Sequence, residues 1–429
     1  MRTLPVAQGT CRVCRHVGVS VLGDRRFLRF FAAQAISMFG DRMVAVALAF
    51  AVIELGGSAT DVGLVLAARA VPLIACLLIG GVVADRTSRR GVLVTADLVR
   101  LGSQGFLAAW LILGRPSVLA IALLAGVTGA AAGFAAPATT GLMPEVVAPE
   151  RLADANGMRA TAFSAGELGG PLLSGVLVAV AGPGWALGVD ALTFAISASL
   201  LVGLSLPAAP RRRRGDSFVA DLRGGWDAFR SQRWLWTFVI WASVANLLFG
   251  SYKVLGPVVA HRDLGGAATW GLLVSAMGAG SVFGGVLALR LRPRRPMLVV
   301  AGTGSLFGAP LAALAATETV ALIAVGCFAA GVGLMLGNTL SETTVQRHVP
   351  PESLSRVSSY DWFGSLALDP IGLAIWGPIA ALIGIDASLW TAFGLLVAGA
   401  LALLAVPEIR RLPASPPERS ARGRPASAN

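Results

Sequence analysis

Twelve long apolar segments separated by short polar loops constrain this chain more than any other feature of its sequence. A helix needs about 20 mostly apolar residues to cross a bilayer, and each segment is close to that length or longer. The segments fall near residues 27–53, 61–84, 91–113, 117–138, 156–180, 184–206, 234–258, 269–289, 297–315, 319–341, 357–383 and 386–406. The sequence therefore predicts an all-α integral membrane protein with twelve transmembrane helices.

The composition argues against a soluble enzyme. Of the 429 residues, 55% are hydrophobic and only 14% are charged, against roughly 25% charged in soluble domains. The histidines His16, His261 and His348 fall in predicted loops, and the sequence has no nucleophile motif and no phosphate-binding loop. We therefore expect no enzymatic activity and no cofactor.

The charge of the loops predicts the orientation in the membrane. The net charge of +12 would suggest nucleic acid in a soluble chain, but the arginines lie between apolar segments, so we expect no nucleic-acid partner. They concentrate before the first segment, after the second, sixth and eighth, and in the tail. By the positive-inside rule both termini are cytoplasmic, in a multi-pass protein of the cytoplasmic membrane.

The N-terminal leader contains the chain's one candidate metal site. Cys11, Cys14 and His16 offer three possible zinc ligands, but a structural zinc site needs four. We therefore expect a disordered basic leader and no bound metal.

The two halves of the chain resemble each other. Residues 80–86 match residues 284–290 at an offset of 204, and residues 147–152 match residues 349–354 at an offset of 202. Such agreement predicts a parallel repeat of two six-helix units around a midplane cavity, an architecture of secondary transporters. The expected organisation is a leader (1–26), a first bundle (27–206), a linker with an amphipathic helix (207–233), a second bundle (234–406) and a disordered tail (407–429).

The loop after the second segment carries a family motif. Residues 81–90 read G-V-V-A-D-R-T-S-R-R, which resembles the signature G-x-L-A-D-R-x-G-R-R between helices 2 and 3 of the major facilitator superfamily. Val83 replaces the leucine and Ser88 the second glycine. The resemblance extends over nearly all of residues 25–407 and implies the major facilitator fold, with its twelve helices in two six-helix bundles.

This motif predicts a gate. Gly81 would let the second helix approach a neighbour closely, and Asp85 would face the positive N-terminal end of a helix in the other half. Asp85 would then latch the cytoplasmic side. Arg86, Arg89 and Arg90 belong to the same gating motif, although they could equally be positive-inside anchors alone.

The fifth segment carries a second motif. It resembles the helix 5 signature of exporters in this superfamily, G-x8-G-x3-G-P-x2-G-G, at Gly157, Gly166, Gly170, Pro171 and Gly175, with Ser174 in place of the penultimate glycine. Ordinary glycine packing in a membrane helix is the alternative.

Residues 37–41 (S-M-F-G-D) and 143–156 are similar to the exporter branch that contains the enterobactin exporter and macrolide efflux proteins. This resemblance implies export of a hydrophobic or amphipathic small molecule, such as a siderophore, drug or antibiotic, by proton antiport. The helix 4 arginine of many proton antiporters would fall near Ala122, so their proton relay does not transfer directly. The alternatives are a small-solute uptake transporter of the same fold and a non-transporting membrane sensor.

Ionisable residues inside spans are costly and are therefore functional candidates. At about 1.5 Å per residue, Asp41 lies about 21 Å from Phe27, and Arg69 lies at a similar depth, about 22 Å from Ala84. We hypothesise that Asp41 and Arg69 pair near the midplane and that Asp41 accepts the transported proton. A static ion pair is an equal alternative, and Arg42 could compete as a partner.

Two further acidic residues are proton-coupling candidates: Glu167, within the helix 5 motif, and Asp369, at the corresponding place in the eleventh segment. Asp97 and Arg100 are three residues apart on one helical face, near the cytoplasmic end, and predict a structural pair.

Asp190 and Lys253 lie toward the outer ends of their segments, where snorkelling would explain them. We expect the partners of the chain to be a small-molecule cargo, protons and the lipid bilayer, and we expect a monomer.

Overall fold

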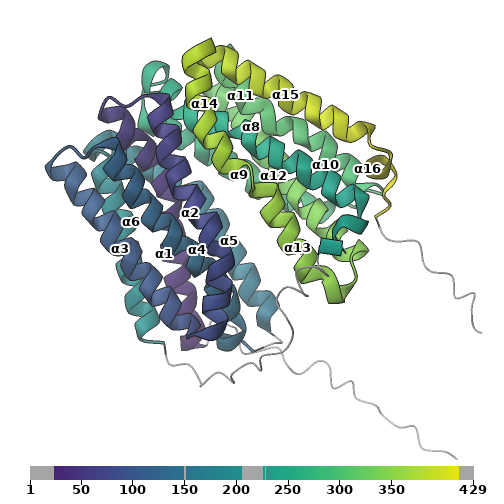
Figure 1. Ribbon diagram of the computed structural model, residues 1–429, viewed down its shortest axis with the longest axis horizontal. Coiled ribbons are helices and arrows are strands. Elements are labelled where there is room, and N and C mark those ends of the chain that lie inside the picture. The colour runs from purple at the N-terminus through teal and green to yellow at the C-terminus, as the bar shows by residue number, and fades with distance from the viewer. Residues whose placement is uncertain (1–23, 149–150, 205–225, 228, 415–429) are drawn as a thin grey trace, which may run out of the picture.

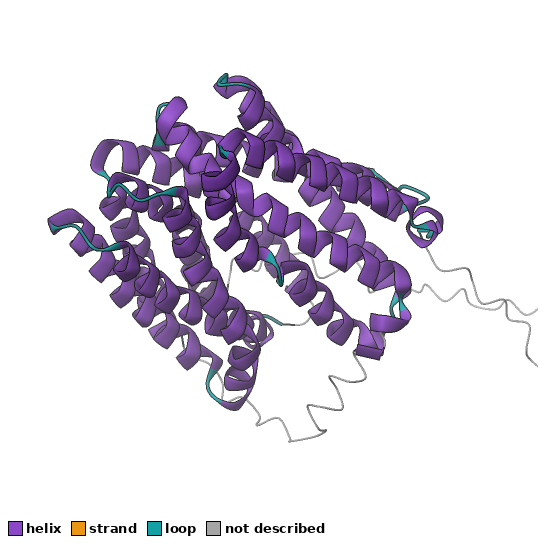
Figure 2. Ribbon diagram, turned by 45° about the horizontal axis from the view of Figure 1, so that its top comes forward, coloured by secondary structure: helices purple, strands orange, loops and turns teal. Residues whose placement is uncertain are grey.

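The protein, in a computed structural model, is described for residues 24–148, 151–204, 226–227 and 229–414. Within these residues the regular structure is helical throughout (Figure 2), and 12 helical segments are long and apolar enough to cross a membrane. The leader with Cys11 and Cys14, most of the predicted linker helix and the end of the tail lie outside the described residues.

The first bundle contains six helices: α1 (Arg25–Glu54), α2 (Ala59–Arg86), α3 (Arg89–Leu113), α4 (Val118–Val146), α5 (Leu152–Ala181) and α6 (Pro183–Val202). The second contains α8 (Arg233–Asp263), α9 (Ala267–Arg290), α10 (Pro296–Gly304), the 3-10 turn η4 (Ser305–Gly308), α11 (Ala309–Ala316), α12 (Val320–His348), α13 (Pro351–Leu366), α14 (Asp369–Ile383) and α15 (Ile385–Ala405). The short α16 (Pro407–Arg411) follows. α10, η4 and α11 form one span, and α13 and α14 together provide the eleventh.

Local sequence signals set several helix ends. Ser58 and Asp61 form a capping box at the start of α2, which satisfies two backbone N–H groups that have no partner within the helix. Gly182 separates α5 from α6 with φ +92°, and Gly384 separates α14 from α15 with φ +88°. These glycines are 202 residues apart, the offset of the internal repeat, so the two halves turn the chain in the same way.

Some helix ends differ from those predicted from hydropathy. α4 continues to Val146 through Pro137 and Pro144, beyond the expected end near 138, and α12 continues to His348, beyond 341. Hydropathy reports the part of a helix that lies in an apolar environment, whereas hydrogen bonding continues into the polar turns beyond it.

The two bundles lie side by side (Figure 1) and contact each other mainly through α5 with α9 and through α2 with α14. We call the end where α1 begins and α15 ends the termini end, and the opposite end, where α1 meets α2, the far end. Figure 1 shows the helices of the two bundles diverging toward the termini end.

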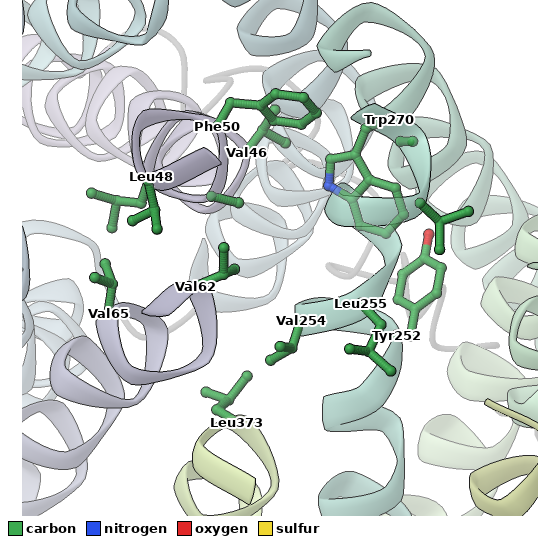
Figure 3. Close-up of a cluster of buried hydrophobic side chains, with 14 of the residues drawn as sticks. Val46, Leu48, Phe50, Val62, Val65, Tyr252, Val254, Leu255, Trp270 and Leu373 are labelled. Atoms are coloured by element: carbon green, nitrogen blue, oxygen red, sulfur yellow. The ribbon is translucent and has the colours of Figure 1, made fainter. Parts of the chain in front are cut away.

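The buried apolar side chains show the same asymmetry. In the far half, one cluster continues across both bundles: Figure 3 shows Val46 and Phe50 of α1 and Val62 of α2 facing Leu255 of α8 and Trp270 of α9. In the termini half, the first bundle has its own cluster and the second bundle has another. The bundles therefore share a core at the far end and have separate cores at the termini end.

Candidate transport site

Asp41 lies in the middle of α1 and joins three helices. Its carboxylate accepts a hydrogen bond from Arg69 Nη2 of α2 at 3.3 Å and another from Arg100 Nη1 of α3 at 3.2 Å. The Asp41 side chain is 26% exposed, and that of Arg100 only 6%. The structure thus pairs Asp41 with Arg69 and adds Arg100, which the sequence analysis did not connect to Asp41.

Arg100 extends this network to α6. Its Nη2 donates to Asp97 Oδ1 at 2.6 Å, its guanidinium lies 4.3 Å from the ring centre of Phe194, and Asp97 Oδ2 accepts a hydrogen bond from Ser197 Oγ at 2.6 Å. Asp97 and Arg100 form the predicted pair. The connection to Asp41 was missed because depth along a helix does not include the reach of an arginine side chain.

The prediction that the Asp190 side chain snorkels to the membrane surface is wrong. This side chain is fully buried, and its Oδ2 accepts a hydrogen bond from Gln104 Nε2 of α3 at 3.0 Å. A methyl group on Gly40 of α1 would lie 2.5 Å from Asp190 Oδ1. Asp190 therefore points into the bundle. Gly40, which precedes Asp41 in the S-M-F-G-D motif, has no side chain and so leaves room for the Asp190 carboxylate.

Arg42 does not compete for Asp41. It points toward α5, where its Nη1 lies 2.5 Å from Glu167 Oε1 and its guanidinium lies 4.4 Å from the ring centre of Phe163. The coupling candidate Glu167 thus forms a separate ion pair between α1 and α5.

The second bundle has a corresponding ion pair. Lys253 Nζ of α8 lies 2.5 Å from Asp369 Oδ1 of α14, so snorkelling was the wrong explanation for Lys253. Asp369 follows Glu167 by 202 residues, the offset of the repeat. Among the described residues, each half therefore has an acid–base pair between its first and fifth spans.

One face of the helix 5 motif packs against α1 of the same bundle. A methyl group on Gly170 would lie 2.6 Å from Cβ of Arg42, and one on Gly166 would lie 3.6 Å from Arg42 Cγ. Ser174, which replaces a glycine of the signature, donates through Oγ to the carbonyl oxygen of Met43 at 2.8 Å. This face holds α5 close against α1.

The same motif also contacts the other bundle. A methyl group on Gly175 would lie 2.5 Å from the carbonyl oxygen of Ala267 and 3.0 Å from Cα of Gly271, and one on Gly271 would lie 2.5 Å from the carbonyl oxygen of Pro171. Gly157 has no atom within 4 Å of such a methyl group. Within the motif, Gly175 and Pro171 therefore bring α5 backbone to backbone with α9.

Two arginines of the gating motif hold α3 to its neighbours. Arg89 Nη1 donates to Glu145 Oε1 at 2.8 Å and to the carbonyl oxygen of Gly141 at 2.6 Å. Arg90 donates to the carbonyl oxygen of Leu201 at 2.8 Å and to that of Val202. They join α3 to the ends of α4 and α6.

The rest of the gating motif lies at the end of α2. A methyl group on Gly81 would lie 4.0 Å from Cβ of Pro137 of α4, whereas one on Gly80 would lie 2.8 Å from the carbonyl oxygen of Gly133, so the close approach to α4 is at Gly80. Arg86 is exposed, and the side chain of Asp85 lies outside the described residues.

The second bundle contains a small cavity of about 70 Å³ between α8, α10 with η4, and α12. Its lining combines aromatic side chains, Trp241 and Phe307, with the amides of Asn246 and Asn338.

Comparisons with known proteins agree with this architecture. The family model described as Major Facilitator Superfamily matches residues 30–366. The enterobactin exporter EntS of Salmonella choleraesuis (strain SC-B67) is 30% identical over 403 residues, which cover 91% of this chain and 94% of that protein. EntS of Escherichia coli O6:K15:H31 (strain 536 / UPEC) is 29% identical over 412 residues, covering 92% and 95%.

Solved structures share the fold at low sequence identity. The nucleoside transporter NupG superposes with a TM-score of 0.69 at 14% identity, covering 89% of this chain and 98% of that one. A bacterial homologue of the human lysosomal transporter Spinster, in an inward-facing conformation, gives a TM-score of 0.66 at 14% identity, with 90% and 95% covered. With its family match, its relatives and its two six-helix bundles, the chain belongs to the major facilitator superfamily of membrane transporters.

Proposed function

We propose that this transporter exports a hydrophobic or amphipathic small molecule, of the siderophore or drug type, across the cytoplasmic membrane in exchange for protons. The observation that carries the proposal is the charged cluster of Asp41, Arg69, Arg100 and Asp97, which joins the middle of α1 to α2 and α3. A charged side chain at the centre of a span costs roughly 2.5–3.5 kcal/mol on insertion scales. The export direction and the cargo class rest on the relatives, which are named enterobactin exporters.

Asp41 is the proton acceptor in this proposal. It holds Arg69 and Arg100 at once, while Arg100 keeps a second carboxylate partner in Asp97. Protonation of Asp41 would therefore weaken the ties of α1 to α2 and to α3, and it would leave the hydrogen bond between Asp97 of α3 and Ser197 of α6 in place. This difference would let a proton change the helix packing around the cargo.

The asymmetric core supports a cargo-loading state. With the termini end cytoplasmic, as the arginine-rich loops predict, the separate cores at that end would leave the two bundles apart toward the cytoplasm. The shared core would close the far end. An exporter needs this arrangement to take up cargo from inside the cell.

Everted membrane vesicles test the proposal, with enterobactin as the cargo and an imposed pH gradient as the driving force. Asp41→Asn should abolish gradient-driven accumulation yet leave enterobactin binding measurable, because an amide keeps the shape of the carboxyl but cannot carry the proton. Glu318→Gln, which removes an exposed acid from a loop, should behave like wild type.

The static ion-pair alternative predicts a different result. Removing one partner of a buried pair costs roughly 3–5 kcal/mol, so Asp41→Asn would lower the yield of folded protein, and adding Arg69→Gln would restore it. A well-folded Asp41→Asn variant that still accumulates enterobactin against a gradient would remove Asp41 from the mechanism. The role would then move to Glu167 or Asp369.

A further inference from the structure

Two buried oxygen atoms at the centre of the first bundle lack a hydrogen-bond donor among the described residues. They are Oε1 of Gln104 and Oδ1 of Asp190. These two side chains already contact each other through Gln104 Nε2 and Asp190 Oδ2 at 3.0 Å, and both are at most 1% exposed. A buried acceptor without a donor is costly, so two of them on one contacting pair call for an explanation.

One proton supplies the missing donor. A primary amide and a carboxylic acid form a cyclic pair in which the amide N–H donates to the carboxyl C=O and the acid O–H donates to the amide C=O. The first of these bonds is present as Nε2 to Oδ2. In that cyclic form, a proton on Asp190 Oδ1 would supply the second bond by donating to Gln104 Oε1, and both oxygens that lack a partner would gain one.

The charges around Asp190 favour the same state. The groups that act on it electrostatically are Asp41 of α1, Arg69 of α2 and Arg100 of α3, and Arg100 also holds Asp97. On α5, Glu167 forms its own ion pair with Arg42. With all groups ionised, three carboxylates would face two guanidinium groups and leave one uncompensated negative charge, which is costly inside a membrane.

We propose that Asp190 is a neutral acid paired with Gln104 while Asp41 is ionised, so that Asp190 and Asp41 are alternative protonation sites for a single proton. When the proton moves, the O–H bond at Asp190 Oδ1 breaks, its electron pair stays on that oxygen, and a new O–H bond forms on Asp41. The negative charge passes from Asp41 to Asp190, and the net charge of the cluster does not change. That this proton is the transported one rests on the proposed antiport; the neutral state of Asp190 does not.

Infrared spectroscopy of the full-length protein in lipid nanodiscs at pH 7 tests the protonation state directly. A protonated carboxyl group has a C=O stretching band that a carboxylate lacks. The wild type should show this band, Asp190→Asn should lose it, and Gln104→Leu should shift it because the acid loses its amide partner. Glu318→Gln, which removes an exposed acid from a loop, should leave it unchanged.

Stability provides a second readout. If Asp190 is neutral, Asp190→Asn replaces one uncharged group by another of the same shape, and the thermal unfolding temperature should match that of the wild type. If Asp190 is ionised, the variant takes a counter-charge from Arg69 and Arg100, and the protein should be destabilised. A wild type without the band, or an Asp190→Asn variant that keeps it, overturns the proposal.

The vesicle assay separates the two proposals. Asp190→Asn should keep exchange of enterobactin at equal pH and lose accumulation driven by a pH gradient. If the infrared band behaves as expected but no gradient-driven transport occurs in the wild type, the antiport proposal fails and the neutral Asp190 stands. If transport is proton-driven but the band is insensitive to Asp190→Asn, the proposal that Asp190 holds a proton fails and the antiport proposal stands.

Discussion

Gly175→Ala should disfavour the conformation described here, in which the bundles share a core at the far end, because Gly175 lies at the contact between α5 and α9. The added methyl group would lie 2.5 Å from the carbonyl oxygen of Ala267 and 3.0 Å from Cα of Gly271. The contact with the oxygen is closer than a methyl carbon tolerates and the contact with Cα is tight, and both involve backbone atoms that cannot rotate away. The two bundles must therefore separate slightly wherever the far end is closed.

The magnitude follows from the cost of overpacking. An extra methyl group in a closely packed interface costs typically about 1–3 kcal/mol. The cost falls only on the state in which α5 and α9 touch, so the equilibrium should shift by roughly fivefold to somewhat more than a hundredfold toward the state with an open far end.

Spin labels at Arg86 and Arg290 measure this shift. These exposed residues end α2 and α9 at the termini end, and pulsed electron paramagnetic resonance in a cysteine-free background gives their distance distribution. Gly175→Ala should raise the fraction of short distances, because closing the termini end accompanies opening of the far end.

Gly157→Ala is the matched control. It lies on the same helix, carries the same gain in helix propensity of about 1 kcal/mol, and meets no atom within 4 Å. Identical distance distributions for Gly157→Ala and Gly175→Ala would refute the idea that this contact sets the equilibrium.

Three further predictions concern the helix ends. Arg89→Ala should lower the free energy of unfolding by about 1–3 kcal/mol by removing a charge-assisted bond to Glu145, and thermal unfolding should show little extra loss when Glu145→Ala is added. Gly182→Ala should cost about 1–2 kcal/mol because Gly182 has φ +92°, whereas Gly102→Ala, in a helix with open space around it, should not destabilise in the same assay. Asp85→Asn should slow efflux from cells at unchanged membrane insertion; wild-type rates at matched expression would contradict the latch.

The sequence predicted the number of helices because that number depends on the length of the apolar segments. It predicted two bundles because the two halves repeat each other at offsets of 202 and 204 residues. It also placed Asp41 and Arg69 at one depth, since depth needs only the rise per residue. It misjudged Asp190 and Lys253 because the direction in which a side chain points around the helix axis depends on the neighbouring helices. Asp190 lies only about 10 Å from the start of α6, yet it faces Gln104 and is fully buried.

The contacts that join the bundles at the far end have a consequence for the evolution of cargo choice. Gly175 meets the backbone of α9, Gly63 meets the backbone of α14 at Leu373, and Gly377 meets the backbone of α2 at Thr60. Because these contacts use main-chain atoms on the partner side, they do not depend on which side chains line the space between the bundles. Substitutions of the side chains that line this space can therefore change the cargo while the backbone contacts between the two bundles stay the same.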